Sequence, residues 1–487
     1  MRLGFQALPK WAGLFPEGPQ VTGLSRPGRR ALLVGFQIVA VAVAMVVLLY
    51  RVAGVPAWDC VYAEDSGIFL VQSLARPWHL LVPYNGYLQF LPRVLAQGVS
   101  LLPLTRAAFA FALLGALIAA GCALFTYHAS AGYIGSRALR AVLALALILL
   151  PVAPLELVDN GVNTPWYLII ALFWAVLWRP RSLPGQVTSA LIAFFAVASS
   201  PLAIVFAPLL AVRVLSLRSV REHAVTIGWL LGWVPQLYVI GLSYSSGTQR
   251  VGSLAPLGAS SGYYLRTVVL RAFGWHVSWD LVRVVGTPWA TVVCGLALAM
   301  LLGLAWMAGG RRTRVFVILA VVFGFVFTVF AATITSYIAG ETPMLTPVSF
   351  EPASRYSALP LLLLDAALIA GADSFAARHG GFRKALATVL HGVFPAALRG
   401  RFETVLRGPR SRPATVVLVA VVLVGLLSIG WVTDYSYSTQ RTTNGPWRPV
   451  VVKWLDHCRH RETIRLPEWT GHQALEYVPV SCSRLIS

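Results

Sequence analysis

The chain has 487 residues, of which 57% are hydrophobic and only 12% charged, and its formal net charge is +21. Its mean hydropathy of +0.72 leaves too little polar surface for a soluble protein. The composition therefore excludes a soluble enzyme and predicts an integral membrane protein.

Apolar runs of the kind that cross a membrane recur along the chain. A helical span needs about 20 mostly apolar residues to cross about 30 Å of hydrocarbon. The runs lie at 31–50, 107–127, 139–154, 165–178, 224–242, 287–307, 315–338, 358–372 and 414–431. The first is no cleaved signal peptide, because about 30 residues precede it and its apolar core exceeds the usual 7–15 residues. Their number predicts an all-α polytopic protein.

Basic residues orient these runs, since Lys and Arg near span ends stay on the cytoplasmic side. Five basic residues and one acid precede the first run, so the N-terminus is expected to be cytoplasmic. A further run, 187–211, obeys the rule only if it is broken at Ser199-Ser200-Pro201, where proline removes a backbone donor. About eleven membrane segments then result, with the C-terminus outside. Nearly all of the net charge becomes cytoplasmic, which anionic lipid explains without nucleic acid.

Three stretches outside the membrane are sizeable in this topology: 52–106, 243–286 and 432–487. In the first, 67–76 and 87–102 are expected to form amphipathic helices that lie in the membrane interface. The chain is thus expected to comprise a basic cytoplasmic N-terminus (1–30), a polytopic transmembrane domain (31–431) and a small extracytoplasmic C-terminal region (432–487).

Two adjacent acids, Glu64 and Asp65, follow the first apolar run in Tyr62-Ala63-Glu64-Asp65-Ser66-Gly67. Two carboxylates at this place suggest a chemical site. They raise one another's pKa when they share a pocket, which suits a general base. The alternative is an exposed acidic turn that caps a helix starting near Ser66.

One span, then a large external loop that opens with an acidic dipeptide, then many further spans form a recognisable order. The short motifs within it are Ala63-Glu64-Asp65-Ser66-Gly67 and Tyr84-Asn85-Gly86-Tyr87-Leu88-Gln89-Phe90-Leu91-Pro92-Arg93. Together they resemble the GT-C superfamily of membrane glycosyltransferases. The resemblance implies transfer of a sugar, with inversion, from a polyprenyl-phosphate donor to an envelope glycan, lipid or protein outside the cytoplasmic membrane. It implies Asp65 as the base and Glu64 as its partner, and the Glu-Asp order leaves the choice between them open.

Further residues are candidates for binding the substrate. A lipid-phosphate leaving group needs a cation, because negative charge builds on its oxygen as the glycosidic bond breaks. Arg355, in Ser354-Arg355-Tyr356, and Arg93 are the candidate cations, and the Arg-Tyr pair also resembles GT-C relatives. The other candidates are Tyr356, Tyr87, Asn85, Glu156, Asp159, Asn160 and Trp166. The alternative for the arginines is snorkelling, and for the aromatic residues an ordinary place at the membrane boundary.

Cysteines and cofactors complete the prediction. Cys458 and Cys482 lie in the external tail and are expected to form a disulfide. No nucleotide cofactor is expected, since the chain has no Walker sequence or dinucleotide fingerprint. No His/Cys cluster indicates zinc, while Glu341 and Glu351 leave a divalent metal open.

The sequence thus predicts a lipid-linked sugar transferase, or a related polymerase or ligase of envelope polysaccharide. A polytopic lipid or polysaccharide transporter, or flippase, is the alternative from another class. Asp365, a carboxylate within a span, is interpreted as a buried contact between helices, and would be a proton relay in a transporter.

Overall fold

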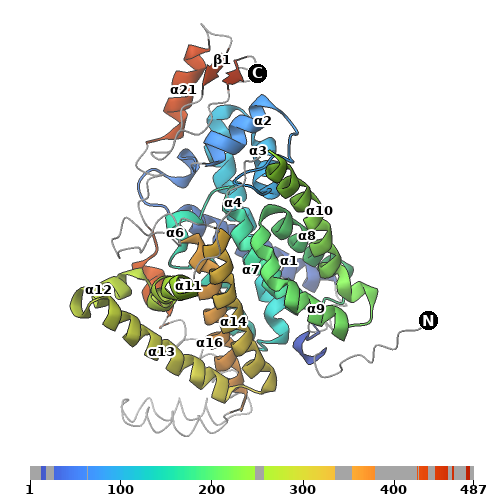
Figure 1. Cartoon of the computed structure of the whole chain (residues 1–487), viewed down its shortest axis with the longest axis vertical. Coiled ribbons are helices and arrows are strands. Elements are labelled where there is room, and N and C mark those ends of the chain that lie inside the picture. Colours follow the sequence, from blue (N-terminus) through green and yellow to red (C-terminus); the bar gives the residue numbers. More distant parts are fainter. Residues whose placement is uncertain are drawn as a thin grey trace.

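The computed structural model describes residues 12–17, 27–62, 64–246, 257–334, 354–378, 425, 427–436, 445–458, 463–465 and 479–482. Helices make up most of this part of the chain (Figure 1). The α-helices are α1 (Pro27–Leu49), α2 (Val71–Ala75), α3 (Phe90–Val99), α4 (Ala107–Ala129), α5 (Arg137–Ile148), α6 (Ala153–Glu156), α7 (Thr164–Leu177), α8 (Leu183–Ser199), α9 (Ala207–Ser216), α10 (Ala224–Ser245), α11 (Leu257–Tyr264), α12 (Trp275–Val285), α13 (Thr287–Ala308), α14 (Arg311–Ile334), α16 (Arg355–Arg378) and α21 (Trp447–His457). Two short strands, β1 (Thr463–Arg465) and β2 (Pro479–Ser481), pair antiparallel.

Six helices in the described residues are long and apolar enough to cross a membrane. They span Ala31–Leu49, Leu104–Gly132, Val220–Ser245, Thr287–Ala308, Arg311–Thr333 and Arg355–Ala377. Each contains or overlaps a run predicted from the sequence. The protein is therefore an all-α, multi-pass membrane protein. Three shorter apolar helices accompany them: Thr164–Leu177, Leu183–Ser199 and Pro201–Ser216.

The run 139–154 is shorter as a helix than expected. α5 ends at Ile148, and a turn precedes the four-residue α6. Pro151 and Pro154 interrupt the run, and a proline has no N–H to continue a helix. Twelve helical residues reach only about 18 Å. Most of the run 414–431 lies outside the described residues.

The break expected at Ser199-Ser200-Pro201 is present. α8 ends at Ser199, Ser200 is extended, and Pro201 begins a 3-10 helix that leads into α9. The chain then returns to the end where α8 started, because Arg213 of α9 donates to the carbonyl oxygen of Trp178, shortly before α8. The proline thus creates a helical hairpin.

Two fully buried arginines tie helix ends together at opposite ends of α7. Arg51 donates to the carbonyl oxygens of Ile148 and Leu150, at the end of α5. Arg213 donates to those of Val176 and Trp178, at the end of α7. The last carbonyls of a helix have no partner inside it, so each guanidinium satisfies several of them.

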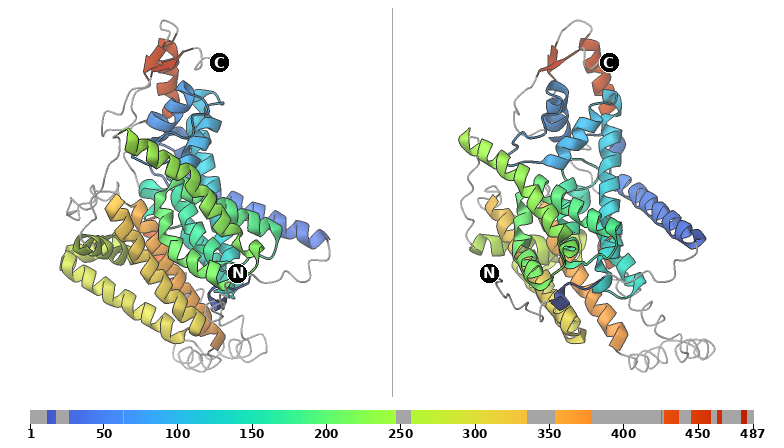
Figure 2. Two further views of the ribbon diagram at one scale, coloured as in Figure 1. Left: turned by 45° about the vertical axis from the view of Figure 1, so that its right-hand side comes forward. Right: turned by 90° about the vertical axis from the view of Figure 1, so that its right-hand side faces the viewer.

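The core surrounds α7, in which every residue except Trp166 is buried. In contrast, α1 leans away from the other helices (Figure 2), and only 6% of its apolar window is buried. Its apolar surface is therefore available to lipid rather than to the protein core.

The segment between α1 and α4 folds above the bundle in Figure 1. A π-helix, Asp65–Leu70, continues directly into α2, where a helix over 67–76 was expected. The second expected helix, 87–102, is α3 (Phe90–Val99).

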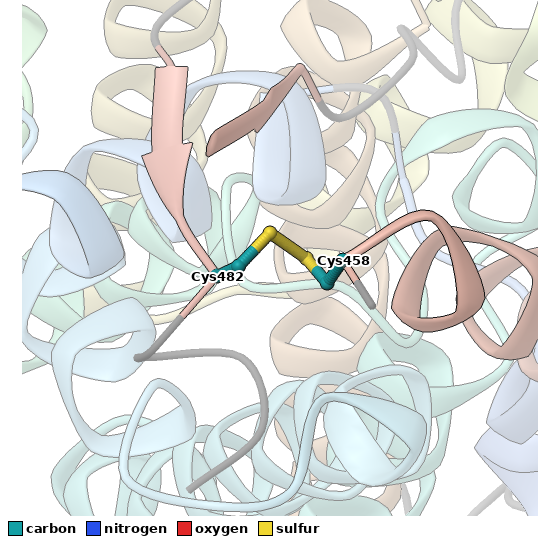
Figure 3. The surroundings of a disulfide bond; sticks show 2 residues. All are labelled: Cys458 and Cys482. Atoms are coloured by element: carbon teal, nitrogen blue, oxygen red, sulfur yellow. A yellow bond between two sulfur atoms is a disulfide. The ribbon is translucent and has the colours of Figure 1, made fainter. Parts of the chain in front are cut away.

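The C-terminal region covers this segment. Trp447 of α21 is fully buried, and its Nε1 donates to the carbonyl oxygen of Leu104 at 2.9 Å. Cys458 and Cys482 form a disulfide that joins the end of α21 to the end of β2 (Figure 3). Within the described part of the tail, α21 thus packs on the segment that contains the acidic pair.

Candidate functional site

A buried ion pair between Glu156 and Arg355 forms the centre of the candidate site. Glu156, which ends α6, accepts hydrogen bonds at Oε2 from Ser354 Oγ at 3.0 Å and from the Arg355 N–H at 2.9 Å. Its Oε1 lies 3.4 Å from Arg355 Nη1. Because Arg355 begins α16, the carboxylate also faces the positive end of that helix. Burial raises the pKa of Glu156, and the guanidinium and the two donors oppose that shift.

Glu64 joins this pair from the segment that follows α1. Its charge acts on both Arg355 and Glu156. Its Oε1 accepts a hydrogen bond from the Tyr84 hydroxyl at 3.3 Å. Its Oε2 is enclosed and has no hydrogen-bond partner among the described residues. We call Glu64, Glu156 and Arg355 the acid–arginine cluster.

Four tyrosines surround the acid–arginine cluster: Tyr62, Tyr84, Tyr87 and Tyr356. The cluster's guanidinium acts on the first three and lies 5.3 Å from the ring centre of Tyr356. Burial raises the pKa of Tyr62 and Tyr84, and raises that of Tyr87 to about 12. At neutral pH these three phenols keep their protons and serve as donors, so the carboxylates remain the candidate bases.

Asp65 is turned away from the acid–arginine cluster. It is fully buried, and its Oδ2 accepts a hydrogen bond from the Gly161 N–H at 2.7 Å. The structure therefore does not contain an exposed acidic cap. The helix begins at the buried Asp65, and Glu64, at its N-cap position, makes no side-chain cap hydrogen bond. The two adjacent acids therefore have different surroundings. Glu64 lies beside Arg355 and Glu156, whereas Asp65 lies beneath the loop before α7.

That loop depends on two glycines. A Cβ on Gly161 would lie 3.0 Å from Asp65 Oδ1 and from Phe111 Cδ1, and a Cβ on Gly115 of α4 would lie 2.7 Å from the backbone of Asn160. Both contacts are too short for another residue without movement. The sequence Asn160-Gly161 thus allows the loop to descend onto α4 and to reach Asp65.

Asn160 uses its side chain inside this loop. Its Nδ2 donates to the carbonyl oxygens of Glu156 and Val158 at 2.7 and 2.9 Å, and its Oδ1 accepts from the Asn163 N–H. Asp159 is 2% exposed and left-handed, with φ of 57°. Its charge acts on Arg51. Asn160 thus holds the loop together, and no contact in the described residues brings either side chain into the acid–arginine cluster.

Arg93 also lies apart from the acid–arginine cluster. It is 3% exposed, its Nη1 donates to Gln72 Oε1 at 2.7 Å, and its guanidinium lies 5.3 Å from the ring centre of Phe69. Burial lowers the pKa of Arg93 to about 10. Its contacts fasten α3 to the helix that begins at Asp65.

Three further candidates have clear positions. The rings of Trp166 and Tyr356 meet edge to face, with centres 5.0 Å apart, so Trp166 braces the tyrosine beneath Arg355. Asn85 is exposed and has a φ of 51°, and Gly86 follows with 87°. Two positive φ values in succession form a type I′ turn, which places Tyr84 and Tyr87 opposite each other.

The structure bears on only part of the metal prediction, because it describes some of the candidate ligands and not others. Among the described residues, no group of three or more His, Cys, Asp or Glu side chains is placed to hold a metal ion. Glu341 and Glu351 lie outside the described residues.

Sequence reasoning did not select Tyr62, Tyr84 or Ser354 as site residues, although all three contact or influence the acid–arginine cluster. The alternation of aromatic with polar residues over 52–106 was the signal available for the two tyrosines. It was attributed to the membrane boundary, where tyrosine is common for another reason.

Comparison of the chain with models of known protein families and with curated protein sequences gives no match. The function must therefore be argued from the site. The acid–arginine cluster combines a carboxylate with an unbonded oxygen, a partly exposed guanidinium and phenolic donors. Such a set accepts a proton and stabilises an anion within one small region.

Proposed function

We propose that the protein is a membrane glycosyltransferase of GT-C type. It takes a sugar from a polyprenyl-phosphate donor and transfers it, with inversion, to an envelope glycan, lipid or protein. In this proposal the chain has eleven segments in the cytoplasmic membrane, a cytoplasmic N-terminus and a C-terminus outside. The acid–arginine cluster then lies at the outer face, where lipid-linked sugars are used.

The observation that carries the proposal is the meeting of Glu64, Glu156 and Arg355 at the start of a membrane-spanning helix. Three segments distant in sequence supply these charges. Placing a buried carboxylate beside a partly buried arginine and a second acid costs free energy, and such clusters of charge are typical of functional sites. The Arg355 side chain remains 23% exposed and is reachable by a ligand.

The proposed reaction assigns one part to each charge. The acceptor hydroxyl or amine gives its proton to Glu64 as its oxygen or nitrogen attacks the anomeric carbon of the sugar. The bond between that carbon and the phosphate oxygen breaks, and the electron pair stays on the phosphate. Arg355 stabilises the resulting charge on polyprenyl phosphate, while Glu156 fixes the direction of the guanidinium.

Glu64 is preferred here to Asp65 as the base, which reverses the order that the resemblance implied. Support comes from the position of Glu64, whose charge acts on Arg355 and Glu156. Asp65 instead accepts the Gly161 N–H beneath the loop before α7. In this proposal Asp65 is a positioning residue.

The test is transfer of radiolabelled sugar from a panel of polyprenyl-phosphate sugars by purified protein in lipid. Glu64→Gln should lower kcat by about 10²–10⁴-fold, the usual contribution of a general base. Asp59→Asn is the matched control: this acid lies in the same segment and accepts from the Arg448 N–H instead. It should transfer sugar like the wild type.

Two results would contradict the proposal. Transfer that persists in Glu64→Gln with an unchanged pH profile would remove Glu64 as the base. No transfer from any donor, with donor-lipid binding equal in wild type and Glu64→Gln, would favour a transporter.

A further inference from the structure

A large apolar cavity lies apart from the acid–arginine cluster. Its volume is about 570 Å³, and its walls come from α13, α16, the turn before α12, and residues 427–431. The α16 wall extends from Leu361 to Phe375, a length of about 21 Å at 1.5 Å per residue. Both α13 and α16 are candidate membrane spans. The cavity therefore lies at membrane depth, where lipid is the available ligand.

The charged residues that line the cavity make its two ends different. Arg271 is 2% exposed and lines the cavity together with Gly274, next to Gly430. Asp365 is the one acid among the lining residues and lies on the α16 wall. An anionic group is thus attracted at the Arg271 end. The rest of the wall is apolar and suits a hydrocarbon chain.

A row of stacked side chains marks the Arg271 end as the level of lipid headgroups. Arg271 lies over the ring of Trp275 at 5.3 Å, Trp275 stacks on Trp279 at 5.7 Å, and Arg283 lies over Trp279 at 5.1 Å. Tryptophan and arginine concentrate at the membrane–water boundary. The segment 257–286 contains three arginines and one acid, Asp280, so its net charge favours anionic lipid.

We propose that this cavity binds one anionic phospholipid of the bilayer, with its phosphate at Arg271 and an acyl chain between α13 and α16. The site is separate from glycosyl transfer and does not depend on it. Tyr263 lies between the two regions, within electrostatic range of Arg271 on one side and of Tyr356 and Glu156 on the other. A lipid here fills space between helices and stabilises their packing.

The test is native mass spectrometry of the full-length protein, delipidated in detergent. It is titrated separately with phosphatidylglycerol, with phosphatidylcholine of the same chains, and with a polyprenyl phosphate. Wild type should bind one phosphatidylglycerol about tenfold more tightly than phosphatidylcholine, because both lipids offer a phosphate to Arg271 but the choline cation of phosphatidylcholine is repelled there. Arg271→Gln should abolish this preference. Arg266→Gln, in the same segment but not lining the cavity, should keep it.

A second pair of variants tests the cavity itself, whether or not Arg271→Gln folds. Leu301→Trp fills the cavity and should lower the affinity for both phospholipids, with the lipid-free unfolding temperature no lower than that of its control. That control, Leu296→Trp, lies on the same helix with a 67% exposed side chain and should bind as wild type. Equal binding by both α13 variants would overturn the proposal. So would preferential binding of polyprenyl phosphate that only Leu301→Trp removes.

Discussion

Asp65 and Glu64 are neighbours in the chain, yet their carboxylates have separate partners. Asp65 binds the Gly161 N–H beneath the loop before α7, whereas Glu64 binds Tyr84 beside Arg355. The sequence identified the acidic pair as a site because two carboxylates after a span are unusual. The sequence could not assign the two acids to different surroundings, because the partner of Asp65 lies in a loop almost 100 residues further along the chain. Asn160 and Asp159 were predicted to bind substrate, whereas Asn160 makes hydrogen bonds within its own loop and the charge of Asp159 acts on Arg51.

We expect Asp65→Asn to lower stability more than it lowers turnover. The amide oxygen keeps an acceptor for the Gly161 N–H, but the hydrogen bond loses its charge and about half its strength, a cost of about 1 kcal/mol. Thermal unfolding in detergent measures this. Asp65→Leu should cost about 1–3 kcal/mol, because it leaves the buried N–H unsatisfied. If Asp65→Asn unfolds as wild type but transfers no sugar, Asp65 rather than Glu64 is the base.

At the scale of elements, the membrane-spanning helices were the most predictable part of the fold. The length of an apolar run determines whether a helix can cross the membrane, and all six long helices coincide with predicted runs. The hairpin at Pro201 was also predictable, because charge distribution and proline chemistry agree there. The shortness of α5 was not recognised, since Pro151 was read within an apolar run. How the helices pack depends on individual small residues, which hydropathy does not weigh.

The contact between α8 and α10 gives a matched test of such small residues. A Cβ on Gly228 would lie 2.1 Å from the carbonyl oxygen of Ala190, whereas one on Gly241 of the same helix meets nothing within 4 Å. Gly228→Ala should therefore destabilise the protein despite better helix propensity. Gly241→Ala should be neutral or stabilising by up to about 1 kcal/mol. Unfolding temperatures of the two variants compare them, and equal values would show that α8 and α10 are not in close contact.

Over the whole molecule, covalent and hydrogen-bonded ties link regions that the sequence separates. Arg51 donates from the end of α1 both to the end of α5 and to the carbonyl oxygens of Asp434 and Tyr435. The C-terminal region, closed by Cys458 and Cys482, rests on the segment that contains Glu64. The sequence suggested the disulfide from its compartment, but not where the closed region would rest.

Alkylation of the denatured protein counts the thiols directly. The chain has five cysteines, of which Cys60, Cys122 and Cys294 lie outside the disulfide and keep their thiols. Mass spectrometry should therefore find three adducts without reductant and five after reduction. Four or five adducts without reductant, in protein isolated without reducing agents, would mean that the disulfide does not form. An impermeant reagent that reaches reduced Cys458 only from the cytoplasmic side would contradict the proposed topology.

The π-helix at Asp65–Leu70 has an implication for comparing this chain with others. Its wider turn, closed by i→i+5 rather than i→i+4 hydrogen bonds, holds one residue more than an α-helical turn. A related protein with a plain α-turn would need one residue fewer between the acidic pair and α2. Aligning such a protein from α2 without a gap would pair its first acid with Asp65 and leave Glu64 opposite the residue before that acid. Equivalent residues at this site must therefore be identified from superposed structures rather than from an ungapped sequence alignment.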